Sequence, residues 1–250
     1  MDEIEYIRIW SEITPINMCI VCNRRLSLEE MEFIIAQKKA CAQVNWTAVL
    51  HEQSTEDYLL LVMVLLKHDM VKDGQRCVVW VRHAESLQNV YQAEGRYDLS
   101  KGMHDAPLSE RGKKSLEYIS SMVDKLELGG VFENVFCSPL TRTIKTCEAI
   151  TKKPIKVLGC LAERATHSSD IGDPMSVLRK RYPQHTFEGD EVWWSPVIES
   201  VGHFRERLRN VWRVPIGQGH ALVVSHGGVI GQLFDRLVPN CGTVVRQILG

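Results

Sequence analysis

Arg82 and His83 directly follow a run of four apolar residues, 78–81, three of which are β-branched. Such a run is typical of a strand that is buried on both faces of a parallel sheet. Ligands of open α/β sheets bind at the carboxyl ends of the strands, where this pair would lie. A guanidinium beside an imidazole at that edge predicts an anion site that contains a nucleophile or a base.

Two other candidate strands end in residues of the same chemistry. Residues 135–137 lead into a Ser-Pro pair that favours a helix start, which places Arg142 in the first helical turn. Free N–H groups and the helix dipole favour an anion there. Residues 221–224 lead into His226, followed by Gly227 and a second glycine that let the backbone turn sharply. If these strands are neighbours in one parallel sheet, their terminal side chains converge.

Four segments of the chain carry a family resemblance. The segment 82–86, Arg-His-Ala-Glu-Ser, resembles the Arg-His-Gly-Glu signature of the histidine phosphatase (phosphoglycerate mutase-like) superfamily. Segments 105–112, 138–146 and 225–228 are similar to its Asp-x-Pro-Leu-Thr-x-x-Gly, Ser-Pro-Leu-x-Arg-x-x-x-Thr and second-histidine segments. Four motifs in the right order are far more specific than any one alone. The resemblance covers roughly residues 76–250, and residues 1–70 match nothing that we can name.

The resemblance implies a role for each residue of the predicted anion site. His83 would be the nucleophile, transiently phosphorylated, with a backbone carbonyl holding its other ring nitrogen. Arg82 and Arg142 would bind phosphate oxygens through their guanidinium forks. His226, if protonated, would be a third cationic donor, and Asn89 would donate its side-chain amide. Phosphoryl transfer depends mainly on such positioning and charge stabilisation.

Three residues leave alternatives open. Asn89 could instead cap a helix. Gly227 would contact the substrate, although a glycine at this position is more simply explained by a requirement of the backbone than by a ligand contact. Ala84 stands where the family has glycine, so the loop would be strained if that position needs a positive φ.

A general acid is still required to protonate the leaving oxygen and then to activate water. The resemblance assigns it to a Glu in a mid-chain Leu-x-Glu segment, which Glu163 matches. Asp170 and Asp173 are the competing candidates. Glu163 and Arg164 could equally form an exposed ion pair that contributes little.

Alternating strands and helices predict an α/β fold with a mostly parallel sheet and helices on both faces, the three-layer sandwich of phosphoglycerate mutase-like proteins. Strands are expected at 78–81, 135–137, 155–158, 221–224 and 244–249, and helices at 109–126, 139–151, 176–182, 198–212 and 227–237. Residues 73–250 would form the histidine phosphatase domain. Residues 1–72 would form a mainly helical extension of unknown role, with a strand at 18–21 and helices at 27–43 and 54–67.

The segment 168–194 is expected to frame the pocket mouth, with Trp193 and Trp194 as its aromatic members. An irregular surface segment with half-buried aromatic side chains is the alternative. Cys19 and Cys22 have the spacing of half a zinc site, but no second pair follows at finger or ribbon spacing. Two small buried side chains are therefore the simpler interpretation.

The composition narrows the class of protein. A net charge of −1 and a pI near 6.8 argue against a broad nucleic-acid or anionic-membrane surface. The amino terminus is acidic and unlike a signal peptide, and the longest apolar run, 58–66, is too short to span a bilayer. Eight cysteines without an export signal are typical of reduced thiols, so a cytoplasmic protein is expected.

These observations predict a histidine acid-type phosphatase, a phosphoric monoester hydrolase that needs neither metal nor cofactor. The stretch between the two histidines leaves little room for a large insertion, and the residues after His226 suffice for one helix and one strand, which favours hydrolysis over a mutase. A phosphorylated small molecule or phosphoprotein is the expected substrate, ahead of a nucleic acid, and residues 1–72 could bind a protein partner. A non-catalytic or weakly catalytic scaffold on the same fold is the alternative from another class.

Overall fold

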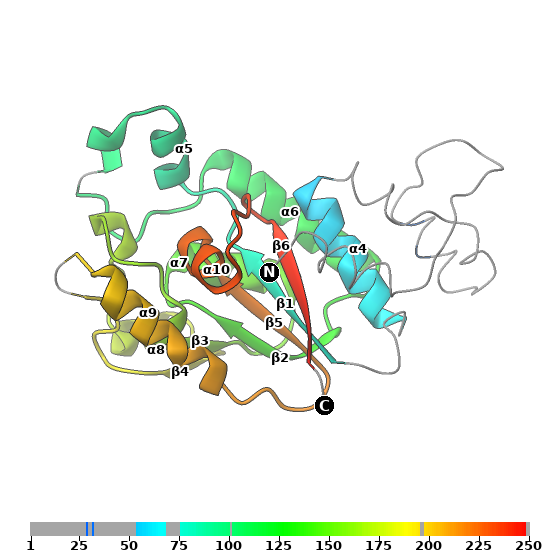
Figure 1. Ribbon diagram of the computed structural model, residues 1–250. Helices are drawn as coiled ribbons and strands as arrows, with labels where there is room; N and C mark the ends of the chain where they lie inside the picture. The colour runs from blue at the N-terminus through cyan, green and yellow to red at the C-terminus, as the bar shows by residue number, and fades with distance from the viewer. Residues whose placement is uncertain are drawn as a thin grey trace.

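The computed structural model describes residues 54–68, 76–100, 102–195 and 198–248, together with Glu29 and Glu32. Within these ranges the chain forms a six-stranded sheet with the strand order β4–β3–β2–β5–β1–β6 (Figure 1). The first five strands in this order run parallel, and the edge strand β6 is antiparallel to β1. The strands are β1 (Arg76–Arg82), β2 (Phe132–Cys137), β3 (Lys156–Leu158), β4 (Thr186–Glu188), β5 (His220–Ser225) and β6 (Thr243–Ile248).

Helices pack against both faces of this sheet, which confirms the predicted fold class. The α-helices are α4 (Thr55–Lys67), α5 (Leu87–Ala93), α6 (Glu110–Lys125), α7 (Thr141–Ile150), α8 (Met175–Arg181), α9 (Val201–Arg209) and α10 (Gly227–Phe234). Single 3-10 turns are η3 (Tyr97–Ser100), η4 (Gly159–Leu161), η5 (Ser168–Asp170) and η6 (Val211–Arg213). None of the helices in the described part of the chain combines the length and hydrophobicity that a bilayer crossing requires.

Side-chain alternation along β1 divides the core into two clusters. Val79 and Val81 face one side of the sheet, where they pack with side chains of α4, α6, α7 and α8. Val78 and Trp80 face the other side, with α9, η6 and α10. Successive strand residues point to opposite faces, so a continuous apolar run is what a strand covered on both sides requires.

Helix α4 belongs to the first of these clusters. Ser54 caps it, accepting a 3.1 Å hydrogen bond from the Asp57 amide, as the sequence predicts. All eight residues 59–66 are buried in the core that β1 and α6 also form. The Ser115 hydroxyl of α6 donates to Glu56 at 2.6 Å and so ties the two helices. The boundary predicted at 72/73, the strand at 18–21, Cys19 and Cys22, and most of the helix at 27–43 lie outside the described residues.

The predicted helix at 139–151 starts two residues later, at Thr141, and Ser138 is not its cap. The position before the helix is Leu140, which has no side chain that can accept a hydrogen bond. The carboxylate of Asp105, from another segment, accepts instead from the Thr141 amide at 3.0 Å and from its hydroxyl at 2.5 Å. A cap supplied from a distant segment leaves no local sequence signal.

Two further expectations need correction. The helix predicted over 198–212 ends at Arg209, and the chain continues through the short turn η6. The Trp193 and Trp194 side chains, expected at the pocket mouth, pack with the first core cluster, and the Trp193 indole donates to the Asp173 carbonyl at 2.9 Å. The helix expected at 176–182 is present as α8, and with β4 it excludes the irregular alternative for the segment 168–194.

Candidate functional site

The ends of three neighbouring strands meet at one place. In the parallel register Arg82 lies opposite Ser225, and Cys137 lies opposite Val224. The residues that follow these positions therefore share one edge of the sheet. The His83 and His226 rings lie there with their centroids 5.0 Å apart. The predicted convergence of the strand ends is thus what the fold produces.

The hydrogen bond of His83 fixes which ring nitrogen carries the proton. Its Nδ1 lies 2.7 Å from the Ala84 carbonyl oxygen, which can only accept, so Nδ1 is the donor. In the neutral ring Nε2 then keeps its lone pair. Burial, and next the positive charge of Arg142, hold the pKa of His83 well below its usual range. A buried neutral imidazole with a fixed tautomer can act as a nucleophile.

Ala84, which departs from the family pattern, causes no backbone strain. It is not among the described non-glycine residues with a positive φ. Its amide donates to the Thr146 hydroxyl at 3.0 Å, and that hydroxyl donates to the Arg142 carbonyl at 2.7 Å. The Thr146 hydroxyl therefore joins the first motif, at Ala84, to the third motif, at Arg142.

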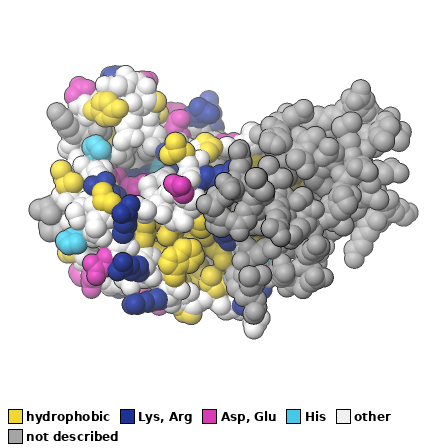
Figure 2. Space-filling view, viewed as in Figure 1, with side chains coloured by type: hydrophobic (Ala, Val, Ile, Leu, Met, Phe, Trp, Pro, Cys, Tyr) yellow, Lys and Arg dark blue, Asp and Glu magenta, His cyan; other side chains and the backbone are white. Residues whose placement is uncertain are grey.

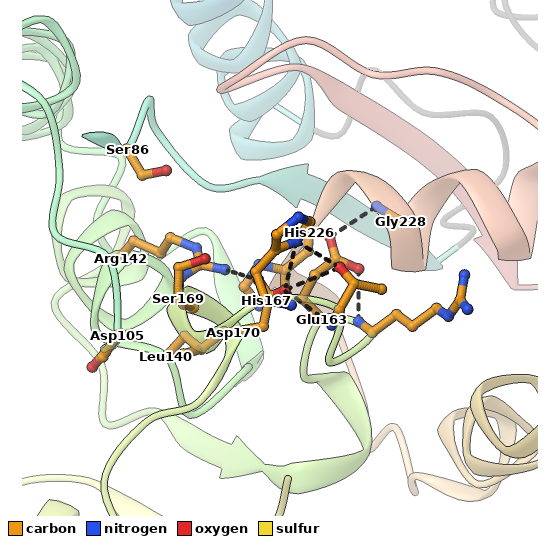
Figure 3. Close-up of polar contacts among 12 residues, drawn as sticks. Ser86, Asp105, Leu140, Arg142, Glu163, His167, Ser169, Asp170, His226 and Gly228 are labelled. Carbon is orange, nitrogen blue, oxygen red and sulfur yellow. Dashed lines mark hydrogen bonds and ion pairs between the residues drawn. The ribbon is translucent and has the colours of Figure 1, made fainter. Parts of the chain in front are cut away.

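Arg142 is fully buried in α7 and lies against the turn η5. It donates to the Ser169 carbonyl at 3.0 Å and approaches Asp170 Oδ1 at 3.3 Å (Figure 3). Asp170 is equally buried and also accepts from the His167 amide at 3.1 Å. The guanidinium is thereby held in place, while its Nε has no hydrogen-bond partner.

Arg82 and His226 resemble Arg142 in having buried nitrogens without a partner. Arg82 donates to the Val238 carbonyl at 2.8 Å, whereas its Nε makes no hydrogen bond. His226 Nε2 lies 2.7 Å from the Ser138 hydroxyl, and its Nδ1 makes no hydrogen bond. Unpaired buried polar atoms are rare in folded proteins and costly. Three of the five such atoms in the described residues lie in these three side chains.

Glu163 lies against the amino terminus of α10. One carboxylate oxygen accepts from the Gly228 amide at 3.0 Å and the other from the Arg164 amide at 2.8 Å (Figure 3). Burial raises the pKa of Glu163 above its ordinary value. A Cβ on Gly228 would lie 2.3 Å from the carboxylate, so only glycine permits this approach. Glu163 makes no exposed pair with Arg164, which donates from its Nε to the Glu199 carbonyl at 2.8 Å.

The two competing acids are placed differently. Asp170 is the buried counter-ion of Arg142. Asp173 pairs with Arg181 at 2.6 Å and does not line the cavity that holds the histidine. Of the three carboxylates, Glu163 alone lines the cavity without forming an ion pair with a described cationic side chain.

Asn89 belongs to the capping box of α5. Its side-chain oxygen accepts from the Ser86 amide at 3.1 Å and from the Asn240 amide at 3.1 Å. The capping alternative is therefore realised, with Ser86 as the cap residue. The oxygen is occupied, and the –NH₂ end of this residue remains available to donate into the cavity, which Asn89 lines.

The second motif, 105–112, contacts helix α7 and the loop that follows His83. Asp105 has a φ of 45° and caps α7. Ser109 donates its hydroxyl to Glu85 at 2.7 Å and its amide to the Glu85 carbonyl at 2.9 Å. A Cβ on Gly112 would lie 2.1 Å from that carbonyl oxygen, so the helix α6 reaches the His83 loop only with glycine here.

These side chains surround a cavity of about 620 Å³, which we call the polar cavity. It is lined by Arg82, His83, Gln88, Asn89, Gln92, Arg142, Glu163, Arg164, Thr166, His167, Asp170, Gly227, Gly228, Leu237, Val238 and Pro239. His226 is not in its wall but lies beside His83. A Cβ on Gly227 would lie 3.2 Å from Arg82 Nε, so this glycine leaves room for the guanidinium.

Several wall residues carry no signal in the sequence. Gln88 and Gln92 occupy α5, a short helix that the apolar pattern does not predict. Leu237 and its two successors come from the loop after α10. Within the described residues no group of three His, Cys, Asp or Glu side chains is placed to hold a metal ion.

The comparison with known protein families agrees with the sequence motifs. No curated protein matches the chain. Its fold is similar to that of the product of open reading frame Rv3214 from Mycobacterium tuberculosis, with 20% identity, 70% of this chain and 96% of that one covered, and a TM-score of 0.44. It is also similar to Entamoeba histolytica phosphoserine phosphatase in complex with 3-phosphoglyceric acid, with 16% identity, 68% and 89% covered, and a TM-score of 0.42. The model of the histidine phosphatase superfamily (branch 1) matches residues 78–241, and the chain therefore belongs to this family.

Proposed function

We propose that this chain hydrolyses phosphomonoesters through a phosphohistidine on His83. The observation that carries the proposal is a set of buried nitrogens without partners: those of Arg82 and Arg142, which line the same cavity as His83, and that of His226, whose ring lies beside His83. Desolvating these donors costs free energy unless an acceptor restores their hydrogen bonds. A tetrahedral phosphoryl group offers several anionic oxygens to such donors.

In the first step His83 Nε2 attacks phosphorus, and the N–P bond forms as the bond to the leaving oxygen breaks. The Nδ1–H donor keeps its bond to the Ala84 carbonyl throughout, which spreads the developing positive charge. Arg82 and Arg142 neutralise the equatorial oxygens. Protonated Glu163 gives its proton to the leaving oxygen, which departs as an alcohol.

His226 can contribute to this step as a neutral donor. Burial, followed by the charge of Arg142, lowers its pKa well below the usual range. The Ser138 hydroxyl can donate to Nε2, which leaves the proton on the unpartnered Nδ1. This refines the expectation that His226 acts as a cation.

In the second step water attacks the phosphorus atom from the side that the alcohol left. The Glu163 carboxylate accepts a proton from that water, and the N–P bond breaks. Inorganic phosphate is released, and His83 returns to its neutral tautomer. Burial raises the pKa of Glu163, which favours the protonated carboxyl that the first step requires.

The proposal is tested with the full chain, p-nitrophenyl phosphate and a chelator in the buffer. Wild type should release phosphate, and a rapid quench in alkaline detergent should trap a phosphoprotein that is stable to base and labile to acid. The His83→Ala variant should lose at least about a thousandfold in kcat/KM and trap none. His203→Ala, an exposed position on α9, is the matched control. Retained activity in His83→Ala would refute the nucleophile, and turnover only with an added bisphosphate would indicate a mutase.

A further inference from the structure

A second cavity of about 460 Å³ lies on the face of the sheet that α9 and α10 pack against. Its floor comes from β1, β2, β3 and β5, and its wall from η6 and the residues that follow. It shares no lining residue with the polar cavity. Figure 2 shows hydrophobic side chains gathered near the middle of the described face, beside α9. We call this space the apolar cavity.

Among the described residues, no long helix continues over this part of the sheet. Helix α9 ends at Arg209, so only the single turn η6 continues along the face. Trp80, Val223 and Phe136 are cross-strand neighbours and form the middle of the floor. Each of the three is at most 5% exposed, so the floor is deep rather than a flat surface patch.

The entrance is marked by an exposed aromatic side chain. Trp212 of η6 is 64% exposed although it lines the cavity. Its ring lies 6.4 Å from that of Phe234, which in turn lies 5.4 Å from Trp80. Aromatic side chains running from the surface to the floor provide a continuous apolar path.

One of the described lining residues is charged. Arg246 lies opposite Val78 in the β1–β6 register, on the cavity face of the sheet, and is half-buried. Its guanidinium lies 5.0 Å above the Phe234 ring centre. A guanidinium carries five donors in a fixed fork, so it can bind a carboxylate while keeping its other contacts.

We propose that the apolar cavity binds a small amphiphile, with its apolar body on the floor and its carboxylate on Arg246. Small-molecule sites are concave, mostly apolar and equipped with a few placed polar groups, and this volume is within their usual range. A protein partner would need a broad surface, whereas the floor here is sunken. Arg246, the one cation among the described lining residues, favours an anionic head group over a neutral one.

The test uses the full chain and dodecanoate below its micelle concentration, followed by calorimetric titration. Wild type should bind it, and Arg246→Gln should weaken binding about tenfold or more because a charged hydrogen bond is lost. Arg246→Lys should restore most of the affinity. The matched neutral probe dodecan-1-ol should bind wild type and Arg246→Gln alike. Equal dodecanoate affinity in wild type and Arg246→Gln would overturn the proposal.

Two further measurements locate the ligand. Trp212→Ala, at the exposed entrance, should weaken both probes, since it removes apolar contact without touching the core. Inorganic phosphate should not displace dodecanoate, because the two cavities share no lining residue. Displacement by phosphate, or unchanged binding to Trp212→Ala, would place the ligand elsewhere. No binding to wild type, together with a dimer in sedimentation velocity, would mean that a second copy covers this face.

Discussion

Strands β1, β2 and β5 contribute their middles to the floor of the apolar cavity, and the segments that follow their carboxyl ends line the polar cavity, yet the two cavities differ completely in chemistry. Along β1 the side chains of Val78 and Trp80 line the apolar cavity. At the end of the same strand Arg82 and His83 line the polar one. The position of a residue along a parallel strand therefore determines the polarity of the cavity that it lines. The middle of the strand is packed against helices and is apolar, while its carboxyl end faces loops and helix termini.

The two cavities also differ in the burial and the partners of their charged side chains. The polar cavity holds a buried ion pair, Arg142 with Asp170, and nitrogens without partners. The apolar cavity has one half-buried cation at its edge. A buried charged side chain can take part in a reaction only when neighbouring groups hold it in place. A half-buried charged side chain at the edge can be removed with a smaller loss of folding stability. Each prediction below tests part of this contrast.

The largest difference is expected between two arginines. Arg142→Met should lower the free energy of unfolding by about 3–5 kcal/mol, because it leaves Asp170 buried without its counter-ion. Arg246→Met should lower it by no more than about 1 kcal/mol, because the contacts of a half-buried cation at the sheet edge, its cation–π contact with Phe234 among them, are partly screened by solvent. Urea unfolding followed by circular dichroism measures both.

A second substitution separates the contribution of charge from that of packing in the Arg142–Asp170 pair. Asp170→Asn in the Arg142→Met background should recover part of the loss, since the uncompensated charge is then gone. Equal losses in Arg142→Met and Arg246→Met would contradict the contrast between an interior and an edge cation.

The next largest effect is expected at two glycines of α10. Gly228→Ala should lower kcat/KM about a hundredfold, because its Cβ displaces the Glu163 carboxylate and with it the general acid. The loss should be larger for an alkyl phosphate than for p-nitrophenyl phosphate, whose leaving group needs no proton. Gly231→Ala, where the nearest atom is 3.5 Å away, should stay within about twofold. Identical rates for the two variants would remove Glu163 from the proposed mechanism.

The sequence predicts the parts of the site that depend on local patterns. The apolar run of β1 and the motifs around His83 and Arg142 place those residues at strand ends, and the parallel register brings the ends together. The expectation of a backbone carbonyl behind His83 is confirmed, and the structure identifies it as that of Ala84. The assigned chemical roles stay predictions.

What the sequence does not predict depends on contacts between distant residues. Asp105 caps α7 from 36 positions away, and Gly228 binds Glu163 from 65 positions away. The strand β4 has only three residues, of which Phe187 alone is buried, so it has no recognisable period. Trp193 reads as a surface aromatic residue, but its indole finds a carbonyl that only the folded chain supplies.

A smaller effect is expected in the pH dependence of stability. Burial lowers the pKa of His83 and His226 in the folded protein, whereas unfolding restores the ordinary value near 6.5. The unfolded chain then binds more protons, so this stability is complete above pH 6.5 and is lost as the pH falls toward the folded values. Each histidine contributes up to about 1.4 kcal/mol per pH unit.

The His83→Gln variant should therefore show a slope between pH 6.5 and 5 that is shallower by about 1 kcal/mol per pH unit. Urea midpoints across this range measure it. Glu163, whose pKa is raised, titrates in the opposite sense but is present in both proteins, so it cancels from the difference. His203→Gln, at an exposed position, should leave the slope unchanged, and a matching change there would show that burial is not the cause.

The smallest effect is expected at the entrance of the apolar cavity. Trp212→Ser should change the free energy of unfolding by no more than about 0.5 kcal/mol, because the side chain is 64% exposed and its loss opens no cavity in the core. Its kcat/KM for p-nitrophenyl phosphate should remain within about twofold, since Trp212 touches no wall of the polar cavity. Thermal unfolding and initial rates check the two values. A loss above about 1 kcal/mol would mean that η6 holds the sheet face closed, and the apolar cavity would then be part of the core.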